Sequence, residues 1–360
     1  MVYKRKRRWI GLVAIAGLIK IFSFFPSLVE KYYSNGIYPL IARLLRILFG
    51  WIPFSVGDLV YLVAGIFLLV RLIAFFKKIF TRKAGRSYLL SSLGRVTESL
   101  LILYIVFNLV WGLNYNRQGV ASQMGLTVEP YSTADLSSVL QLIIKRVNEV
   151  DLESRKVRSQ LKSKSDLFRL SADSYGRLHD LDSIFAYPSP SIKPSVFSYL
   201  GDYLGFTGYY NPFSGEAQVN TTIPEFTRPF TCCHEIGHQI GYAKENEANI
   251  AGYLSAKSSG NPAFRYSVYF ELYFYAAREL YLRDSNLLKP LKAQLNPDIR
   301  QDYKDLNAFY RQYQNPFEPY IRMLYGNYLK ANEQPQGLMS YNAVIAWLIA
   351  YYKKEGPQAI

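Results

Sequence analysis

The sequence predicts membrane-crossing α-helices over residues 1–113, followed by a mostly helical α+β domain over residues 114–360. Three apolar runs in the first part are long enough to cross a bilayer, whereas the second part is mixed, polar and rich in tyrosine. Within the second part, a segment punctuated by proline, serine and glycine separates stretches with helical patterns. That composition is typical of strands and turns.

The predicted spans are close to the roughly 20 helical residues that a bilayer requires. They cover about residues 9–28, 59–76 and 96–113. Each contains one ionisable residue, in chain order Lys20, Arg71 and Glu98. Between the first two spans, residues 38–51 are apolar but too short to cross and carry two arginines. They predict an interfacial or re-entrant amphipathic helix that ends at Pro53.

Basic residues predict the orientation. The net charge is +15, and much of the excess sits in two clusters beside apolar runs, residues 4–8 and 77–86. Such clusters favour the cytoplasmic side, so three crossings place residues 114–360 outside the cytoplasm. This pattern indicates membrane topology and not nucleic-acid binding, because the sequence lacks a basic-aromatic RNA motif and a glycine-rich phosphate loop.

The second part predicts several helices and a short sheet. Ser132 and Asp135 form a capping-box pattern that opens a helix through residue 147 or beyond. Weak alternation over residues 216–220 predicts a strand, which could be either a substrate-binding edge strand or part of a buried hairpin. Further helices are predicted over residues 263–282, near 301–313 and over 340–352.

The motif HExxH stands at residues 234–238 and contains two of the three histidines of the chain. On a helix, positions i and i+4 share a face, so His234 and His238 can bind one zinc ion. Glu235 can then act as general base toward a water molecule that the metal activates. The flanking residues are largely apolar, and burying these polar groups without a partner would be costly. The third histidine, His179, has no partner at metal-binding spacing and is interpreted as a surface or core residue.

A catalytic zinc site takes a third protein ligand and leaves one position open. The next candidates are Glu245 and Glu247, and the sequence leaves both possible. Lys244 stands where a third histidine would fall in HExxHxxGxxH, which excludes that arrangement. Asn249 lies one helical turn after Glu245, so it can orient a ligand histidine by hydrogen bonding.

At these residues the chain resembles the gluzincin metallopeptidases, whose second helix carries ExxAD or ExxAN. Residues 245–249 read Glu-Asn-Glu-Ala-Asn. The resemblance implies a zincin-like fold, with His234, His238 and Glu245 as zinc ligands, Glu235 as the base and Asn249 as the orienting residue. The six residues between His238 and Glu245 are fewer than that clan usually has. Gly241 could permit the sharp reversal that this short connection needs.

The whole chain also resembles an uncharacterised family of bacterial multi-pass membrane proteins with an HExxH domain outside the cytoplasm. This resemblance implies the bacterial cytoplasmic (inner) membrane as the location. It rests on the HExxH region and on three other segments, residues 52–58, 210–216 and 337–341.

The expected function is that of a membrane-anchored zinc-dependent metallopeptidase that hydrolyses a peptide or protein substrate. Candidate donors to the developing oxyanion are Tyr242, Tyr266 and Tyr341. The alternative is a non-catalytic membrane sensor or scaffold with a structural zinc site. A transporter is disfavoured, because three helices with few ionisable residues make a poor pathway.

Overall fold

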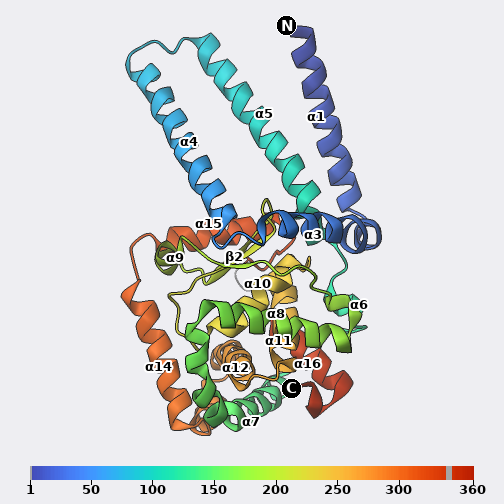
Figure 1. Cartoon of the computed structure of the whole chain (residues 1–360), viewed down its shortest axis with the longest axis vertical. Helices are drawn as coiled ribbons and strands as arrows, with labels where there is room; N and C mark the ends of the chain where they lie inside the picture. Colours follow the sequence, from blue (N-terminus) through green and yellow to red (C-terminus); the bar gives the residue numbers. More distant parts are fainter. Residues whose placement is uncertain (1, 338–342) are drawn as a thin grey trace.

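The computed structural model describes residues 2–337 and 343–360, and it is mostly helical. Three long helices project from one side of a body, and two further helices lie across the base of this projection (Figure 1). The projecting helices are α1 (Val2–Ser23), α4 (Val56–Phe80) and α5 (Arg86–Val110).

The projecting helices carry the segments that could cross a membrane. Within the described residues, α4 and α5 are long and apolar enough, and a third span results if the bent pair of residues 7–23 and 26–49 counts as one. None of the most apolar stretch of α4 is buried by protein, as expected for a helix surrounded by lipid. The predicted spans over 59–76 and 96–113 fall on α4 and α5, although α5 ends at Val110 and a 3-10 helix, η2 (Gly112–Asn116), follows.

The prediction that the first span continues to residue 28 is wrong. α1 ends at Ser23, and the chain bends by 97° before it continues through residues 26–49. Pro26 is the first residue of the next helix, and Phe25 before it has non-helical dihedral angles. A residue that precedes proline is sterically disfavoured in the helical region, so the helix cannot run on through this point.

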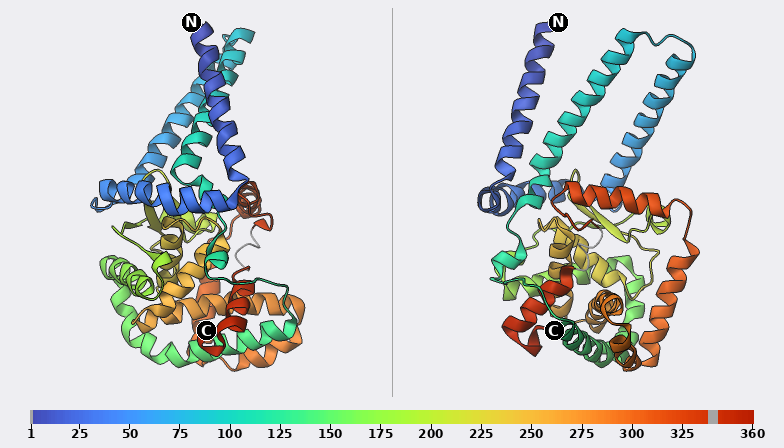
Figure 2. Two further views of the ribbon diagram at one scale, coloured as in Figure 1. Left: turned by 90° about the vertical axis from the view of Figure 1, so that its right-hand side faces the viewer. Right: turned by 180° about the vertical axis from the view of Figure 1, so that it is seen from behind.

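After the bend the chain lies across the base of the projecting helices. It passes through α2 (Pro26–Leu28) and the π-helix η1 (Val29–Ile37) into α3 (Tyr38–Phe49). The interfacial helix predicted over 38–51 corresponds to α3. A second helix, α15 (Glu318–Ala331), also lies across the base of the projecting helices (Figure 1 and the right panel of Figure 2). We call α3 and α15 the transverse layer.

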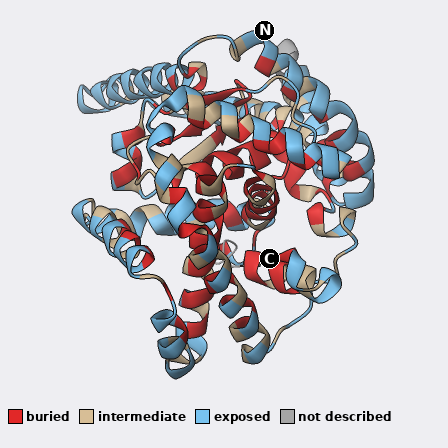
Figure 3. Cartoon of the chain, turned by 60° about the horizontal axis from the view of Figure 1, so that its bottom comes forward, coloured by how far each residue is buried: buried red, intermediate tan, exposed pale blue. Residues whose placement is uncertain are grey.

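The body lies beneath the transverse layer and holds the main hydrophobic core. Buried residues gather on the inner faces of its helices, and the longest of these, α7 and α12, pack against each other (Figure 3). The capping box at Ser132 and Asp135 is confirmed at the start of α7. The predicted helices over 263–282, 301–313 and 340–352 correspond to α12, α14 and α16, with residues 340–342 outside the described part. The helices of the body are α6 (Val120–Gln123), α7 (Thr133–Val157), α8 (Lys164–Leu181), α9 (Ser198–Leu204), α10 (Arg228–Gln239), α11 (Glu245–Ser258), α12 (Pro262–Arg283), α13 (Ser285–Ala293), α14 (Pro297–Gln312) and α16 (Ala343–Glu355).

Three short strands in the described chain form one sheet beside α10. They are β1 (Ile192–Pro194), β2 (Gly208–Asn211) and β3 (Glu216–Val219), in the order β1-β3-β2. Ala217 of β3 is opposite Ile192 in the parallel pair and Tyr210 in the antiparallel pair. The strand predicted over 216–220 is confirmed as β3, and of the two alternatives for it the buried hairpin is the one that the structure shows. Both hydrogen-bonding edges of β3 are paired, so β1 and β2 are the edge strands of the sheet.

The sheet is attached to the foot of α4 by buried hydrogen bonds. The Glu216 carboxylate accepts from the backbone N–H groups of Val56 (3.1 Å) and Gly57 (2.7 Å), where the helix dipole favours a negative charge. Asp58 in turn accepts from the hydroxyl of Tyr209 on β2 and from the backbone N–H of Val196 (2.7 Å). Two of the segments that carry the family resemblance, 52–58 and 210–216, thus pack on each other and join a projecting helix to the sheet.

Candidate metal centre

The HExxH motif lies on α10, which has a proline in its first turn. The helix is buried from Pro229 to Gln239. The helical spacing brings the two imidazoles side by side, with ring centroids 4.7 Å apart. About a tenth of each imidazole side chain remains exposed to solvent. The two rings are therefore buried groups that solvent can still reach.

A tight reversal connects α10 to α11. Gly241 adopts φ +100°, a conformation that residues with a side chain rarely adopt. A Cβ atom there would also lie 2.9 Å from the ring of Tyr38. This glycine permits the short connection that the sequence indicates, and Glu245 becomes the first residue of α11, facing α10.

Three side chains converge at the junction of the two helices. His234, His238 and Glu245 each present a possible ligand atom, and these atoms all lie within 4.8 Å of one another. Glu245 Oε2 lies 3.3 Å from His234 Nε2 and 3.5 Å from His238 Nε2. Burial opposes charge on both partners, but their mutual attraction outweighs it, so the pKa of His238 is raised to about 9 and that of Glu245 is lowered. The cluster stabilises positive charge at its centre.

The other imidazole nitrogens are held by oxygen acceptors. His234 Nδ1 donates to Asn249 Oδ1 (2.7 Å), and His238 Nδ1 donates to the carbonyl oxygen of Tyr242 (2.8 Å). Because Nδ1 of each ring donates to an oxygen, the neutral form of each ring has its lone pair on Nε2, the nitrogen that faces Glu245. This is the arrangement that second-sphere groups impose on metal-binding histidines.

Glu235 lies against the sheet. A Cβ atom on Gly208 of β2 would lie 2.6 Å from Glu235 Oε1, so a glycine is needed where the strand passes the carboxylate. Glu235 Oε2 is buried and has no hydrogen-bond partner among the described residues. Burial raises the pKa of this carboxyl to about 7, against the attraction of His234 and His238. The position leaves one oxygen free to bind a water molecule beside the two imidazoles.

Glu247, the alternative third ligand, points to another part of the body. A Cβ atom on Gly119 would lie 1.9 Å from Glu247 Oε1, so the carboxylate occupies the space beside the start of α6. Burial raises its pKa, and Lys244 and Arg117 oppose that shift. Of the two acids, Glu245 is the one that the structure brings to the histidines.

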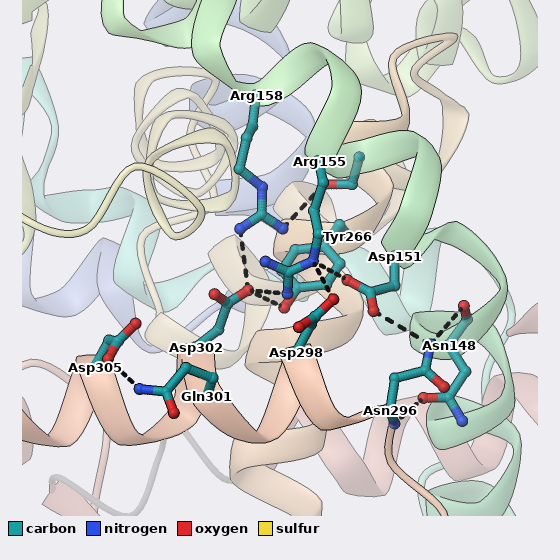
Figure 4. A network of polar contacts seen from close by, with 11 residues as sticks. Asn148, Asp151, Arg155, Arg158, Tyr266, Asn296, Asp298, Gln301, Asp302 and Asp305 are labelled. Carbon is teal, nitrogen blue, oxygen red and sulfur yellow. Dashed lines mark hydrogen bonds and ion pairs between the residues drawn. The ribbon is translucent and has the colours of Figure 1, made fainter.

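Two of the predicted oxyanion donors have their hydroxyl groups engaged elsewhere. The hydroxyl of Tyr242 donates to Gln123 Oε1 (2.8 Å). The hydroxyl of Tyr266 donates to Asp302 (2.5 Å) inside a network of arginines and aspartates (Figure 4). The expectation for Tyr266 is therefore wrong, because its helix α12 turns this side chain toward α14. Tyr341, the third candidate, lies outside the described residues.

Tyr325 is a site residue that the sequence reasoning missed. It lies on α15, and its hydroxyl donates to Glu245 Oε1 (2.9 Å). The backbone N–H of Glu245 also donates to Gln334 (3.0 Å), just beyond α15. Eighty residues separate Tyr325 from Glu245, so local spacing could not indicate this contact.

The C-terminal end of α10 is bound by side chains from the transverse layer and the foot of α5. Its last carbonyl groups have no partner within the helix. Trp111 Nε1, at the foot of α5, donates to the carbonyl of His238 (3.3 Å). From α3, the Tyr38 hydroxyl (2.8 Å) and the Arg46 guanidinium (3.2 Å) both donate to the carbonyl of Gln239. Arg117, which pairs with Glu30 at 2.5 Å, donates to the carbonyl of Gly241 (3.0 Å). The HExxH helix is therefore fixed directly to the elements at the base of the projecting helices.

The residues present fit a zinc ion. Two imidazole nitrogens and one carboxylate oxygen are a common ligand set for catalytic zinc. Glu235 Oε2 and Glu245 Oε2 are buried oxygens without a hydrogen-bond partner in the described chain, which is costly unless a cation or a water molecule satisfies them. Three residues of the part of the chain that the structure describes form this group, the number of protein ligands that a catalytic zinc ion takes.

Comparison with known proteins adds a family but no chemistry. No curated protein and no solved structure matches this chain. One family model matches residues 33–349, which covers the transverse layer, α4, α5 and nearly all of the body. The chain therefore belongs to the family described as "Protein of unknown function (DUF3810)".

Proposed function

We propose that this protein is a membrane-anchored, zinc-dependent peptidase that belongs mechanistically with the gluzincins. The single observation that carries the proposal is the convergence of His234, His238 and Glu245, with Glu235 beside them and its Oε2 without a partner. A set of acceptors without a cationic side chain among them is suited to a metal ion.

His234, His238 and Glu245 would hold the ion, with Asn249 and the carbonyl of Tyr242 fixing the two rings. When bound, zinc supplies Lewis acidity, which lowers the pKa of a water molecule and polarises a carbonyl group. Glu235 accepts one proton of the attacking water as the new carbon–oxygen bond forms, and it delivers that proton to the leaving nitrogen as the carbon–nitrogen bond breaks. The free edge of β2 beside Glu235 offers main-chain groups to an extended substrate.

The proposed orientation places the body outside the cytoplasm of a bacterial cell. The N-terminus and the loop between α4 and α5 both lie at the far end of the projecting helices from the body (Figure 1). The two basic clusters of the sequence stand at these places, residues 4–8 and 77–86. The excess of basic residues favours the cytoplasmic side, so the opposite end of three spans is extracytoplasmic.

Two charges within the projecting helices have partners in the protein, which supports an anchoring role over transport. Glu98 pairs with Arg8 of α1 (2.8 Å), and Lys20 lies 3.7 Å from Glu333. Ionisable groups in a transport pathway face a water-filled cavity, whereas these groups join α1 to its neighbours.

The test is the substitution Glu235→Gln in the full-length protein. We expect a zinc content equal to that of the wild type and a loss of peptide hydrolysis of about 10²–10⁴-fold, the usual contribution of a general base. The matched control is Glu247→Gln, another buried glutamate without a role in the cluster, which should retain both zinc and activity. Equal hydrolysis by wild type and Glu235→Gln would reject the mechanism. Zinc loss in Glu247→Gln would make Glu247 the third ligand.

The same experiment addresses the non-catalytic alternative. A structural zinc site is normally closed by four protein ligands. If the wild-type protein binds zinc tightly but cleaves no peptide of a broad library at saturating concentrations, the sensor or scaffold hypothesis replaces the peptidase.

A further inference from the structure

α15 is a helix with little protein packed around it. Leu329 is its buried residue, whereas Tyr320, Met323 and Leu324 are 64%, 56% and 66% exposed. A helix of 14 residues is marginal in water by itself and normally depends on burying an apolar face. The outward face of α15 therefore needs an apolar surrounding.

The position of α15 identifies that surrounding. Tyr328 hydrogen-bonds with Tyr115 (3.1 Å), directly below the foot of α5. Just beyond the same, C-terminal end of α15, Glu333 lies 3.7 Å from Lys20, near the foot of α1. The C-terminal end of α15 thus lies at the level where the candidate spans end, and the helix runs across the base of the projecting helices in Figure 1 and in the right panel of Figure 2.

α3 repeats the arrangement at the same level. One stripe of α3, formed by Tyr38, Ala42 and Arg46, is buried against the body, while Leu40 and Leu44 are exposed. Both transverse helices thus expose apolar side chains, as α4 does along the projecting part. A helix with this distribution lies in the boundary between lipid headgroups and acyl chains. The surrounding that fits the exposed apolar faces of α3 and α15 is the lipid bilayer.

The inner side of α15 meets the candidate metal centre. Tyr325 links α15 to Glu245 Oε1, so one tyrosine side chain separates the transverse layer from a ligand. On the α3 side, Tyr38 and Arg46 bind the carbonyl of Gln239, the residue after His238. The cluster is therefore next to the layer at the membrane surface and not at the far end of the body.

We propose that α15 rests in the lipid–water interface and that the site acts on polypeptides tethered at the bilayer surface, with the scissile bond close to the lipid. The substrate class rests on the proposed peptidase function, whereas the placement of α15 does not. Only the Tyr325 side chain separates the site from α15, so the site can reach a peptide bond that lies near the membrane. A site at the opposite end of the body could not reach such a bond.

The placement of α15 is tested with a fluorescent label in nanodiscs. Both native cysteines are fully buried, so a label directs itself to an introduced one. At Leu324→Cys we expect quenching by lipids that carry a shallow nitroxide and protection from aqueous iodide. The matched control is Leu152→Cys, an equally exposed leucine (67%) on α7, the helix that lies at the end of the body away from the projecting helices (Figure 1), and we expect the opposite pattern there. Iodide quenching at both positions would overturn the proposal, as would protection of position 324 from both quenchers, which would indicate a protein partner.

The substrate class is tested with a quenched fluorescent peptide library carrying an N-terminal palmitoyl chain, in vesicles of phosphatidylcholine and phosphatidylglycerol. One spacer has about four residues and reaches about 14 Å, and the other has about twenty residues and reaches up to about 70 Å. We expect cleavage with the short spacer at a rate at least equal to that with the long one.

Cleavage with the long spacer alone would overturn the substrate class and leave the peptidase proposal intact. No cleavage of any peptide, tethered or free, would overturn both. Leu324→Glu should reduce cleavage with the short spacer and leave zinc content unchanged, whereas Leu152→Glu should alter neither. Equal rates for these two variants would also count against the proposal.

Discussion

Two buried polar clusters of the body differ in the source of their positive charge. In the first, His234, His238 and Glu245 converge without a lysine or arginine among the grouped residues, and buried carboxylate oxygens are left without a hydrogen bond. In the second, Asp302 accepts from Arg155 and Arg158, both at 3.0 Å, and from the hydroxyl of Tyr266 (Figure 4).

The difference distinguishes a structural cluster from one suited to a ligand. The protein itself supplies the cations around Asp302, and Arg155 also pairs with Asp151 (2.8 Å), so helices α7 and α14 are held together without an added group. The HExxH cluster has imidazole nitrogens and a carboxylate, which can accept a cation, where the second cluster has the guanidinium groups of two arginines. We propose that a bound cation completes it, so the two clusters should respond differently to substitution.

The largest expected effect is that of His238→Ala. Because zinc needs its protein ligands together, the metal retained after dialysis should fall from about one ion per chain to background. The measurement is elemental analysis of the purified full-length protein. His179→Ala, at an exposed position on α8, should retain the metal. Retention by His238→Ala would break the comparison, because the cluster would then not depend on its second imidazole.

Asp302→Asn should affect stability and leave the metal bound. Removing one charge from a buried ion pair leaves its partners uncompensated, so the free energy of unfolding should fall by about 3 kcal/mol. Thermal unfolding followed by circular dichroism measures this change. Asp305→Asn, one turn along α14 and exposed, should shift the midpoint little. A loss of zinc in Asp302→Asn without a change in stability would contradict the structural role of this cluster.

Asn249→Ala should weaken metal binding without abolishing it. The loss of an orienting hydrogen bond to a ligand histidine typically lowers metal affinity about 10–100-fold. Competition with a chelator of known affinity measures the change. Asn249→Asp retains an oxygen acceptor for His234 Nδ1 and should recover most of the affinity. Equal weakening by both variants would show that Asn249 acts through packing and not through its oxygen.

The smallest expected effect is that of Tyr266→Phe. One hydrogen bond to Asp302 is lost, which costs about 1 kcal/mol of stability. Peptide hydrolysis should be unchanged, because this hydroxyl lies in the Asp302 network. A fall in kcat of about 10²-fold or more would return Tyr266 to the candidate oxyanion donors.

Features that depend on local spacing could be predicted. The capping box at Ser132, the apolar lengths of α4 and α5, and the pairing of two histidines one turn apart all follow from residues within a few turns of one another. The bend at Pro26 is also local, and the prediction of a span through residue 28 missed it because apolar content does not reveal where a helix changes direction.

Features that depend on distant neighbours could not be predicted. The central position of β3 follows from β1 and β2, which pair on either side of it. The engagement of Tyr266 follows from α14, more than thirty residues away. In each case the residue type allowed several partners, and the packing of remote elements selected one.

The amino-acid sequence by itself determined that two imidazoles share one helix face, that Glu235 stands next to the first of them, and that long apolar helices precede the body. Helical periodicity and length decide these features within one element. Only the tertiary structure decided between Glu245 and Glu247, and only it brought Tyr325 to the cluster and the transverse layer against α10. The physical reason is that a side chain's direction follows from its own helix, whereas the group it meets depends on how the helices pack.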